Sequence, residues 1–318
     1  MKTYEIVMVG NTSVGKTSML AAMNQYIRNV NKDLGVSFVP YGSTTNDLSE
    51  AWIDLCAAVE KGSTFQPLTA HLEGTVDYVT YKFNLCMKGV PKARVEFIDT
   101  KGAFICDSDG TGLAEKASNA LGVFCVVDAS VLMECDCSTN RLFNRPDLVA
   151  DLLGKLFARD RHPQFVAFVL TKCETYVQNE EKLSRLKEKF HRAYQQSIDL
   201  LRAKRISTYG MSVQTLGCVQ FQRCVETPYG DKTLSLPQFE KMPGATQIAS
   251  RDCEVPLLWT MKHVLWKMNE EKTWIDWLWD RLFGNALIEY IRQIEDAWKK
   301  RESKQSYYEK LASHHVPQ

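Results

Sequence analysis

A short segment near the start of the chain carries the residue types that cradle phosphate. "GNTSVGKTS" fits the pattern G-x-x-x-x-G-K-[ST], and its members are Gly10, Asn11, Thr12, Ser13, Val14, Gly15, Lys16, Thr17 and Ser18. The glycines let backbone N–H groups turn toward phosphate oxygens, and a following helix adds the partial positive charge of its N-terminus. In this pattern Lys16 bridges the β- and γ-phosphates, and the Thr17 hydroxyl binds Mg²⁺. The segment therefore predicts a nucleotide site.

Strands and helices alternate along the chain. The phosphate loop needs this arrangement, because it follows a strand and opens a helix. The predicted strands are Tyr4 to Val9, Tyr78 to Met87, Arg94 to Ile98, Leu121 to Val127, Phe165 to Leu170 and Tyr209 to Gln214. The predicted helices are Thr17 to Val30, Leu48 to Val59, Leu148 to Ala158 and Glu180 to Lys204. Continuous apolar strands suit burial on both faces. The alternation predicts an α/β fold with a mostly parallel sheet covered by helices on both faces.

Composition and charge exclude several classes of protein. The chain has 318 residues, 45% hydrophobic and 24% charged, which is ordinary for a soluble globular protein. Its net charge of +1 gives no bulk attraction to nucleic acid or to an acidic membrane. No apolar run approaches the roughly 18 to 20 residues that span a bilayer. No secretory signal opens the chain, so we expect a cytoplasmic, reducing environment for its ten cysteines.

A zinc site is one possible use of the cysteines. Cys135 and Cys137 form a C-x-C pair, but structural zinc sites need four ligands and no second pair is visible. The sequence therefore favours free thiols in a loop. "DSDGTG", Asp107 to Gly112, likewise resembles the start of a calcium loop but lacks the further ligands and the distal Glu. A flexible loop is the favoured interpretation.

Three further motifs follow the phosphate loop in order: "FIDTKG", "LTKCE" and "SVQTLG". With the phosphate loop, they resemble the P-loop GTPases of the translation-factor and Ras-like (TRAFAC) class. The resemblance covers roughly Tyr4 to Met268 and is greatest to the bacterial proteins called double-GTPases. It implies a three-layer Ras-like fold and a cytosolic bacterial GTPase, encoded beside partner proteins in conflict or defence systems.

The resemblance assigns the metal and phosphate contacts beyond the loop. Asp99 of "FIDTKG" would hold Mg²⁺ through water, and the Gly102 amide would touch the γ-phosphate. The first-switch threonine that senses the metal and the phosphate is assigned to Thr75, in "LEGTVDYVTY". Thr69, Thr64 and the pair Thr44 and Thr45 remain alternatives. The long gap before Asp99 implies an enlarged first switch, about residues 31–76.

The resemblance also assigns the base contacts. "LTKCE" is similar to the family's [NT]-K-x-D motif, so Thr171, Lys172 and Glu174 would bind the nucleotide, with Lys172 along the base. Glu174, in place of the usual Asp, would accept hydrogen bonds from the ring N–H and exocyclic amine of guanine. Thr215 and Leu216 of "SVQTLG" would back the guanine edge. The alternative is a helix start in which Thr171 caps and Glu174 completes a capping box.

Hydrolysis is expected to be slow. Ras-like enzymes place a water-orienting Gln directly after D-x-x-G, whereas this chain has Ala103 followed by Phe104. Ser13 stands where potassium-activated relatives carry Asn, so potassium activation is not indicated. The motif also departs from the family at Lys101. We expect a Mg²⁺-dependent GTP/GDP switch with a low intrinsic rate and a protein effector or activating partner. The alternatives are a non-hydrolysing nucleotide-dependent interaction module and an ATP-using P-loop protein.

The last part of the chain departs from the α/β rhythm. We divide the chain into a P-loop GTPase domain, 1–270, and an extension, 271–318. Within the domain, the sequence predicts an insertion at about 218–252 that forms a loop or a hairpin. The extension reads as helical from Thr273 to about Leu311, and six of the seven tryptophans lie between Trp259 and Trp298. Packing against the sheet domain, a protein partner and membrane contact are the alternatives. Ten basic and nine acidic residues from Lys262 onward make the membrane the least favoured.

Overall fold

The computed structural model describes residues 1–11, 13–30, 35–62, 64–65, 78–100, 111–229, 232–272, 288–293, 296 and 307–312. Its strands are β1 (Thr3–Val9), β2 (Val36–Pro40), β3 (Thr64–Phe65), β4 (Val79–Met87), β5 (Val90–Asp99), β6 (Gly122–Asp128), β7 (Phe165–Thr171), β8 (Ser207–Ser212), β9 (Val219–Tyr229), β10 (Lys232–Lys241) and β11 (Tyr308–Ala312). Its helices are α1 (Lys16–Val30), α2 (Thr44–Lys61), α3 (Thr111–Ser118), α4 (Ala129–Glu134), α5 (Cys137–Phe143), α6 (Pro146–Phe157), α7 (Glu180–Ala203) and α8 (Val255–Glu270).

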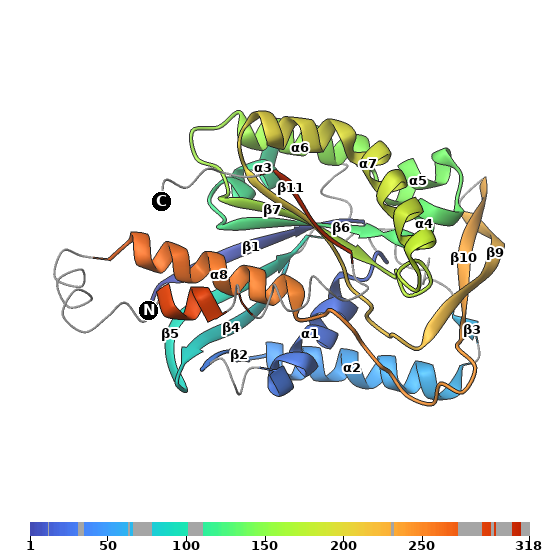
Figure 1. Ribbon diagram of the computed structural model, residues 1–318, viewed down its shortest axis with the longest axis horizontal. Helices are drawn as coiled ribbons and strands as arrows, with labels where there is room; N and C mark the ends of the chain where they lie inside the picture. Colours follow the sequence, from blue (N-terminus) through green and yellow to red (C-terminus); the bar gives the residue numbers. More distant parts are fainter. Residues whose placement is uncertain are drawn as a thin grey trace.

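An eight-stranded sheet in the order β11-β8-β7-β6-β1-β5-β4-β2 forms the centre of the molecule (Figure 1). The neighbours from β8 to β5 pair in parallel, whereas β4, β2 and β11 pair antiparallel at the two sides. Helices α3, α6 and α7 lie on one face, and α1, α2 and α8 lie on the other (Figure 1). The predicted α/β class, with a mostly parallel sheet covered by helices on both faces, is confirmed.

The parallel strands end at a common edge. Asp99 of β5 lies opposite Met8 of β1, and Asp128 of β6 lies opposite Thr171 of β7. Ser212 of β8 lies opposite Leu170 in the same register. The loops that follow these strands therefore emerge side by side, which is where open α/β sheets bind ligands. All four predicted motifs begin or end at this edge.

Alternation along the strands divides the apolar residues between two cores. On β1, Ile6 and Met8 join the core under α1 and α8, while Val7 and Val9 join the core under α3, α6 and α7. β7 is buried along its whole length, "FVAFVLT", because helices cover both of its faces. This two-sided burial fixes the strand register, since a one-residue slip would exchange the two cores.

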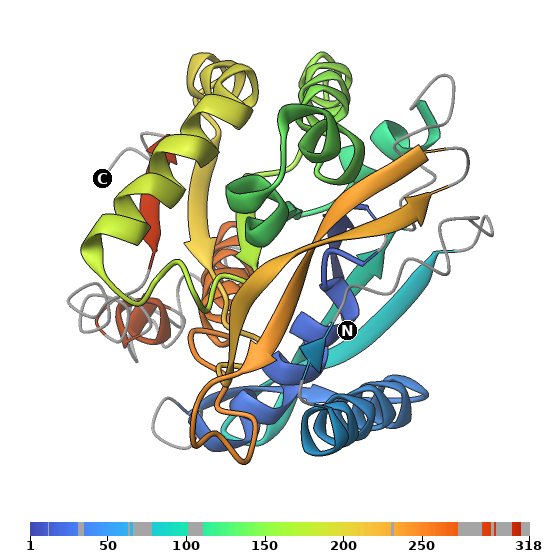
Figure 2. The ribbon, with the colours of Figure 1, turned by 90° about the vertical axis from the view of Figure 1, so that its right-hand side faces the viewer.

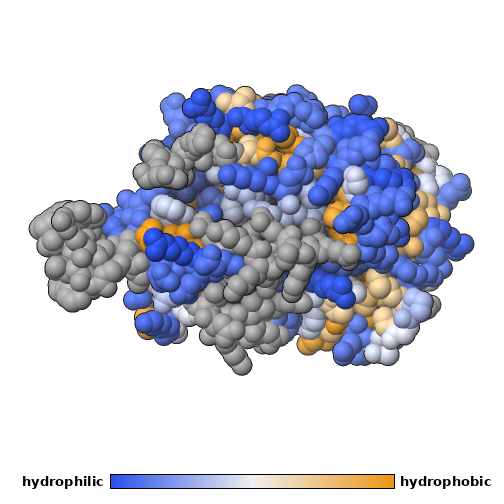
Figure 3. Space-filling model, viewed as in Figure 1, coloured by the Kyte–Doolittle hydropathy of each residue, from blue (hydrophilic) through white to orange (hydrophobic). Residues whose placement is uncertain are grey.

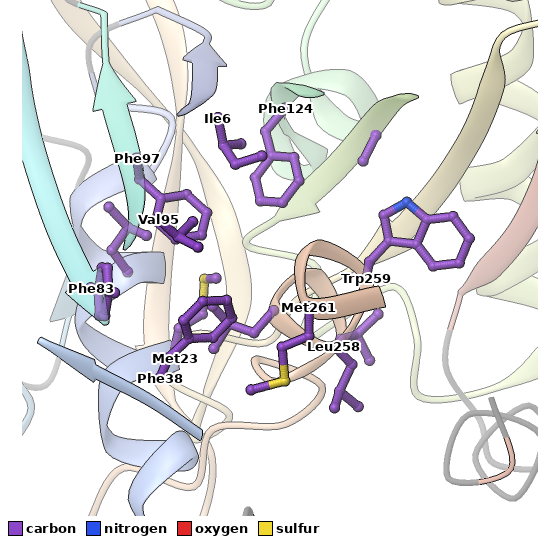
Figure 4. Packing of buried hydrophobic residues seen from close by; sticks show 14 of the residues in the cluster. Ile6, Met23, Phe38, Phe83, Val95, Phe97, Phe124, Leu258, Trp259 and Met261 are labelled. Atoms are coloured by element: carbon purple, nitrogen blue, oxygen red, sulfur yellow. The ribbon is translucent and has the colours of Figure 1, made fainter. Parts of the chain in front are cut away.

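A row of aromatic rings crosses the sheet on the α1 side. Phe38 of β2 contacts Phe83 of β4 at 6.1 Å between ring centroids, and Phe83 contacts Phe97 of β5 at 5.6 Å. Phe97 then meets Phe124 of β6 at 6.0 Å, and Phe124 meets Phe165 of β7 at 6.2 Å. Figure 4 shows the rings from Phe38 to Phe124 in this row, with Met23 of α1 and Leu258 and Met261 of α8 near them. The row links strands that are far apart in sequence.

The predicted insertion at 218–252 forms a β-hairpin, β9 and β10, and β3 pairs with β10 to make a separate three-stranded sheet. Figure 2 shows the hairpin running diagonally across the face viewed from the right of Figure 1. At one end Phe239 and Val219 pack against Val59 of α2, and at the other Leu234 and Leu236 pack against α4 and α5. The hairpin therefore connects α2 and β3, which lie within the predicted first switch, with the segment after β6.

The described part of the C-terminal segment packs on the sheet domain. Tyr290 and Ile291 are buried in the core with α1 and α8, and Tyr307 is buried against α7. The helical pattern that we predicted to about Leu311 ends earlier, because Tyr308–Ala312 forms β11 and pairs with β8. Pairing with an open sheet edge prevails over local helical spacing here. Four of the six tryptophans between Trp259 and Trp298 lie outside the described residues.

The described residues have the surface of an ordinary folded domain. The face in Figure 3 is mainly hydrophilic, and its hydrophobic side chains form small separate patches among the described atoms. Within the described ranges, none of the helices combines the length and apolar character that a bilayer crossing requires. Cys135 and Cys137 are free cysteines, but the predicted loop is wrong at Cys137, which begins α5, while Cys135 follows α4.

Candidate functional site

The phosphate loop joins the end of β1 to the first residue of α1. A Cβ at Gly10 would lie 2.9 Å from the Val126 carbonyl oxygen, so only glycine lets the loop leave β1 against β6. Ser13 and Gly15 have positive φ, +69° and +98°. Glycine adopts positive φ without strain, which suits it to position 15. The first N–H groups of α1, from Lys16 to Ser18, lie at the loop with no intrahelical partner. Thr12 lies outside the described residues.

Lys16 is the buried cation of this loop. Its Nζ donates hydrogen bonds to the carbonyl oxygens of Gly10 at 2.6 Å and Asn11 at 3.1 Å. Burial lowers the pKa of Lys16, while Asp99, 3.4 Å from Nζ, raises it. A buried ammonium whose partners are loop carbonyls is positioned to receive phosphate oxygens, which offer it stronger, charge-assisted hydrogen bonds.

Thr17 and Asp99 place a hydroxyl and a carboxylate together beside Lys16. Thr17 Oγ1 lies 3.4 Å from Asp99 Oδ2, so these residues bring together the hard oxygen donors that Mg²⁺ prefers. Among the described residues, no group of three or more His, Cys, Asp or Glu is arranged to hold a metal. Because they supply a hydroxyl and a carboxylate, Thr17 and Asp99 fit an ion that takes its remaining ligands from phosphate and water, as Mg²⁺ does. Thr75 and Gly102 lie outside the described residues, as do Lys101, Ala103 and Phe104.

Sequence reasoning missed Tyr81 at this position. Tyr81 is buried on β4, and its phenol makes a side-chain hydrogen bond with Thr17. Burial raises the pKa of Tyr81, and the nearby carboxylates Asp99 and Asp47 raise it further. Asp47 belongs to α2, so this tyrosine lies where α1, α2, β4 and β5 meet. The alternating pattern of β4 placed Tyr81 on the same face as Phe83 but gave no sign of a polar contact.

The residues of "LTKCE" lie against the phosphate loop. Thr171 ends β7, and its hydroxyl lies within hydrogen-bond distance of the carbonyl oxygens of Val14 and Val127. Lys172 adopts φ of +53°, and its Nζ donates to the Ser13 carbonyl oxygen at 2.7 Å. α7 begins only at Glu180, with Asn179 as its N-cap, so the capping-box alternative is wrong. The sequence motif therefore brings a lysine along the side of the loop.

Glu174 is a buried carboxylate, and within the described ranges one of its two oxygens has hydrogen-bond partners. Its side chain is 3% exposed, and Oε1 accepts hydrogen bonds from the N–H groups of Leu216 at 3.1 Å and Gly217 at 3.3 Å. Oε2 is buried and has no hydrogen-bond partner among the described residues. Burial raises the pKa of Glu174, and the neighbouring backbone N–H groups and Lys172 oppose that shift. A buried polar atom of this kind needs a partner.

The loop from Gln214 to Gly217, which bonds Glu174, is hydrogen-bonded to the segment from Ala249 to Arg251 that leads into α8. The backbones of Gln214 and Arg251 exchange hydrogen bonds at 3.0 and 2.9 Å, and Ala249 N–H donates to the Leu216 carbonyl oxygen at 2.8 Å. The Ser250 hydroxyl donates to the Thr215 carbonyl oxygen at 2.6 Å. The predicted pair Thr215 and Leu216 therefore lies beside Glu174 in a fixed loop.

Asp128 is the second residue that sequence reasoning missed. It ends β6 beside Thr171, is almost fully buried, and its Oδ2 accepts a hydrogen bond from Lys172 Nζ. The sequence held one usable signal. An acidic residue closing the apolar strand "LGVFCVV" at the same edge as the phosphate loop is unusual, because buried carboxylates need partners.

The chain matches no known protein-family model. It also matches no curated protein sequence. Among solved structures it is similar to the GTPase-like domain of Ski7 from S. cerevisiae, bound to GTP, with a TM-score of 0.39 and 12% sequence identity. The similarity covers 68% of this chain and 43% of the Ski7 chain, so the chain spans less than half of that structure's length. At these values the similarity does not extend to ligand or activity.

Proposed function

We propose that the chain binds guanine nucleotide and hydrolyses GTP to GDP and phosphate as a Mg²⁺-dependent molecular switch. The observation that carries the proposal is Glu174, whose Oε2 is buried without a described partner. The residue lies two positions after Lys172, which is bonded to the phosphate loop. A base held along Lys172 would bring its hydrogen-bonding edge to this oxygen.

The chemistry of the two purines favours guanine. Guanine offers a ring N–H and an exocyclic amine as adjacent donors, and either can bond a carboxylate oxygen. Adenine has a ring nitrogen acceptor and a C–H at the same edge, so it would leave the buried carboxylate without a partner. A missed hydrogen bond to a buried charged group costs about 1–3 kcal/mol or more. The Glu174 side chain is one methylene longer than the usual Asp. Its two hydrogen bonds from the loop at Leu216 and Gly217 fix the position of the carboxylate.

Phosphoryl transfer needs positioning and charge neutralisation more than covalent chemistry. Lys16 would stabilise the charge on the β- and γ-phosphates, and the N–H groups at the start of α1 would bind their oxygens. Bound Mg²⁺ would supply further charge neutralisation between those phosphates, held by Thr17 and, through water, Asp99. Because Ala103 cannot orient a water molecule, we expect the purified chain to hydrolyse GTP slowly and a partner protein to accelerate it.

The finer assignments belong to the same proposal. The order and spacing of the motifs support membership of the TRAFAC class and, within it, the double-GTPase group. Thr75 and Gly102 are proposed as the switch residues that respond to the γ-phosphate, by their place in the motifs. GTP would order these loops, and hydrolysis would release them. A partner could then distinguish the surface of the GTP-bound state from that of the GDP-bound state.

The experiment is Mg²⁺-dependent binding of a fluorescent GTP analogue, competed with GTP, GDP, ATP and XTP. We expect GTP and GDP to compete far better than ATP, and Lys16→Ala to abolish binding. Lys155→Ala is a matched control, because Lys155 pairs with Asp151 on the exposed surface of α6. Equal competition by ATP would show that Glu174 does not read guanine.

A single-turnover assay with GTP then tests the catalytic part. Slow hydrolysis that requires Mg²⁺ and is lost in Lys16→Ala is the expected result. Tight binding without any hydrolysis would make the chain a nucleotide-dependent interaction module, and fast hydrolysis by the purified monomer would contradict the expected need for a partner.

A further inference from the structure

The carboxylate of Asp128 bonds both the N-terminus of α4 and the side chain of Lys172 at the edge of the sheet. Its Oδ1 accepts hydrogen bonds from the N–H groups of Ser130 at 3.0 Å and Val131 at 3.1 Å, and from the Ser130 hydroxyl at 2.5 Å. These contacts make it the N-cap of α4. Its Oδ2 accepts a hydrogen bond from Lys172 Nζ at 2.5 Å. The two oxygens of one buried side chain therefore serve a helix and a site lysine separately.

Lys172 is held between two acceptors. Its ammonium donates both to Asp128 Oδ2 and to the Ser13 carbonyl oxygen, at 2.5 and 2.7 Å. The side chain of Lys172 is 22% exposed and that of Asp128 is 4% exposed, so the pair is only partly screened by water. The ion pair fixes the far end of the lysine, whose aliphatic stem would lie along the base in the proposed function.

The backbone of Asp128 is fixed as firmly as its side chain. Asn144 accepts from the Asp128 N–H at 2.8 Å and donates to its carbonyl oxygen at 3.0 Å, which closes a ring of two hydrogen bonds. Asn144 also donates to Asn140 Oδ1 at 2.8 Å, and its own carbonyl oxygen accepts from the Tyr194 hydroxyl at 3.2 Å. Tyr194 lies at the kink of α7, where φ is −110° and ψ is 16°. The carboxylate therefore has little freedom to move.

We propose that Asp128 is a positioning residue of the base site, which acts through Lys172 and sets how long a bound guanine nucleotide remains. The inference rests on the proposed function. It assigns to Asp128 a role that a helix N-cap alone would not have. Without the ion pair, the Ser13 carbonyl oxygen is the one acceptor that Lys172 keeps among the described residues, and its stem would no longer be held along the base.

The test is a double-mutant cycle on Asp128→Asn and Lys172→Ala, with release of a fluorescent GDP analogue in Mg²⁺ as the measurement. The Asn side chain retains an acceptor for the α4 cap and removes the charge. Asp136→Asn is the matched control, because Asp136 caps α5 through the Thr139 N–H at 2.7 Å and contacts no predicted site residue. Asp128→Glu, which keeps the charge but displaces it, is a second variant should Asp128→Asn fold poorly.

We expect Asp128→Asn to speed release about tenfold, the effect of losing a charge-assisted hydrogen bond. Asp136→Asn should leave release unchanged, Asp128→Glu should fall between wild type and Asp128→Asn, and Asp128→Asn should add nothing in the Lys172→Ala background. An equal acceleration in both backgrounds would overturn the inference, because Asp128 would then act without Lys172. No binding of GDP by the wild-type chain would refute the proposed function instead, so the two failures are distinguishable.

Discussion

The two carboxylate oxygens of Glu174 have different surroundings, and this difference can be tested. Oε1 bonds the N–H groups of Leu216 and Gly217, while Oε2 has no described partner. In Glu174→Gln the amide oxygen can retain the backbone bonds, which leaves the NH₂ group at the position of Oε2. That group is a donor, so it faces the donors of guanine and suits the C2 carbonyl of xanthine.

We therefore expect Glu174→Gln to weaken GTP binding by at least about tenfold, through loss of a charge-assisted hydrogen bond. XTP binding should strengthen in the same variant. Competition titrations with GTP, ATP and XTP against a fluorescent analogue measure both changes. An unchanged order of affinities would show that Oε2 does not face the base.

Acid should weaken guanine nucleotide binding through the same residue. Burial raises the pKa of Glu174 in the nucleotide-free chain, and donors from guanine favour the ionised form. Binding therefore expels a proton when Glu174 is protonated, so affinity falls as pH falls through the raised pKa. The dissociation constant for GDP, measured from pH 8 downward, should rise earlier for wild type than for Glu174→Gln, whose amide does not titrate.

At the residue scale, the spacing of the motifs predicted which residues lie together at the loop between β1 and α1, but it does not test their metal or base roles. Lys16, Thr17 and Asp99 lie together because a parallel register brings the end of β5 beside the loop after β1. Asp128 and Tyr81 could not be found in this way. Tyr81 belongs to a strand whose sequence reports only burial, whereas Asp128 left one signal, an acidic residue at the end of an apolar strand. Each gains a polar partner from an element distant in sequence. The nucleotide and metal roles of all the predicted site residues stay predictions, and Thr12, Thr75 and Gly102 also lie outside the described residues.

At the scale of elements, the close contact between the base-side loop and the segment before α8 gives a sharp test. Gly217 has φ of +62°, and a Cβ there would lie 1.8 Å from the Ala249 carbonyl oxygen. Gly244 has a similar φ of +77° but no atom within 4 Å of its Cβ position. Alanine at either site incurs the left-handed backbone cost of about 1–2 kcal/mol.

Gly217→Ala should lower the free energy of unfolding by about 1–3 kcal/mol more than Gly244→Ala, because only the former displaces packed backbone. It should also weaken GDP binding, since the Gly217 N–H holds Glu174. Denaturant titrations and GDP binding of both variants measure the two effects. Equal losses of stability would mean that the loop and the segment before α8 can separate without cost.

The contact of α8 with β7 predicts a dependence of stability on pH. His263 stacks on Phe165 at 4.2 Å between ring centroids, and its Nε2 is buried without a described partner. Burial, aided by the charge of Lys262, lowers the pKa of His263 to about 3 from its ordinary value of 6.5. As pH falls, His263 therefore takes up a proton in the unfolded chain before it does so in the folded chain. The stability that the neutral buried ring contributes is complete above pH 6.5 and is lost as pH falls toward 3.

His263→Leu removes this titration. Its unfolding free energy, relative to wild type, should rise by about 2 kcal/mol between pH 7.5 and pH 5, at about 1.4 kcal/mol per pH unit below 6.5. Denaturant titrations of both proteins at several pH values give the difference, in which the shared carboxylates cancel. A difference independent of pH would show that His263 can take up a proton in the folded chain.

Long elements with a clear period were predictable, and short ones were not. β1, β7 and α7 were predicted within one or two residues, because two-sided burial and a charged amphipathic helix leave strong patterns. The six-residue α4 depends on the cap from Asp128, and the two-residue β3 depends on pairing with β10. Neither has enough residues to show a period. β11 was predicted as helix because its sheet partner, β8, lies about a hundred residues earlier.

At the scale of the whole molecule, the proposed site depends on the complete fold. Its described residues come from the ends of β1, β5, β6, β7 and β8, which neighbour one another only when both cores are formed. Local pieces of the chain could not assemble it. Nucleotide should therefore bind the folded chain alone and stabilise it globally, by about 2.7 kcal/mol at a concentration one hundred times the dissociation constant.

For a chain of 318 residues this stabilisation corresponds to a rise of about 4 °C in the melting temperature. We expect Mg²⁺ and GDP to produce it in wild type and in Asp136→Asn, but not in Lys16→Ala, whose loop lacks its ammonium. Because both cores contribute to the site, the unfolding transition should move as one and keep its shape. A shift confined to part of the transition would show that one core forms the site without the other, and an equal shift in Lys16→Ala would place nucleotide binding outside the phosphate loop.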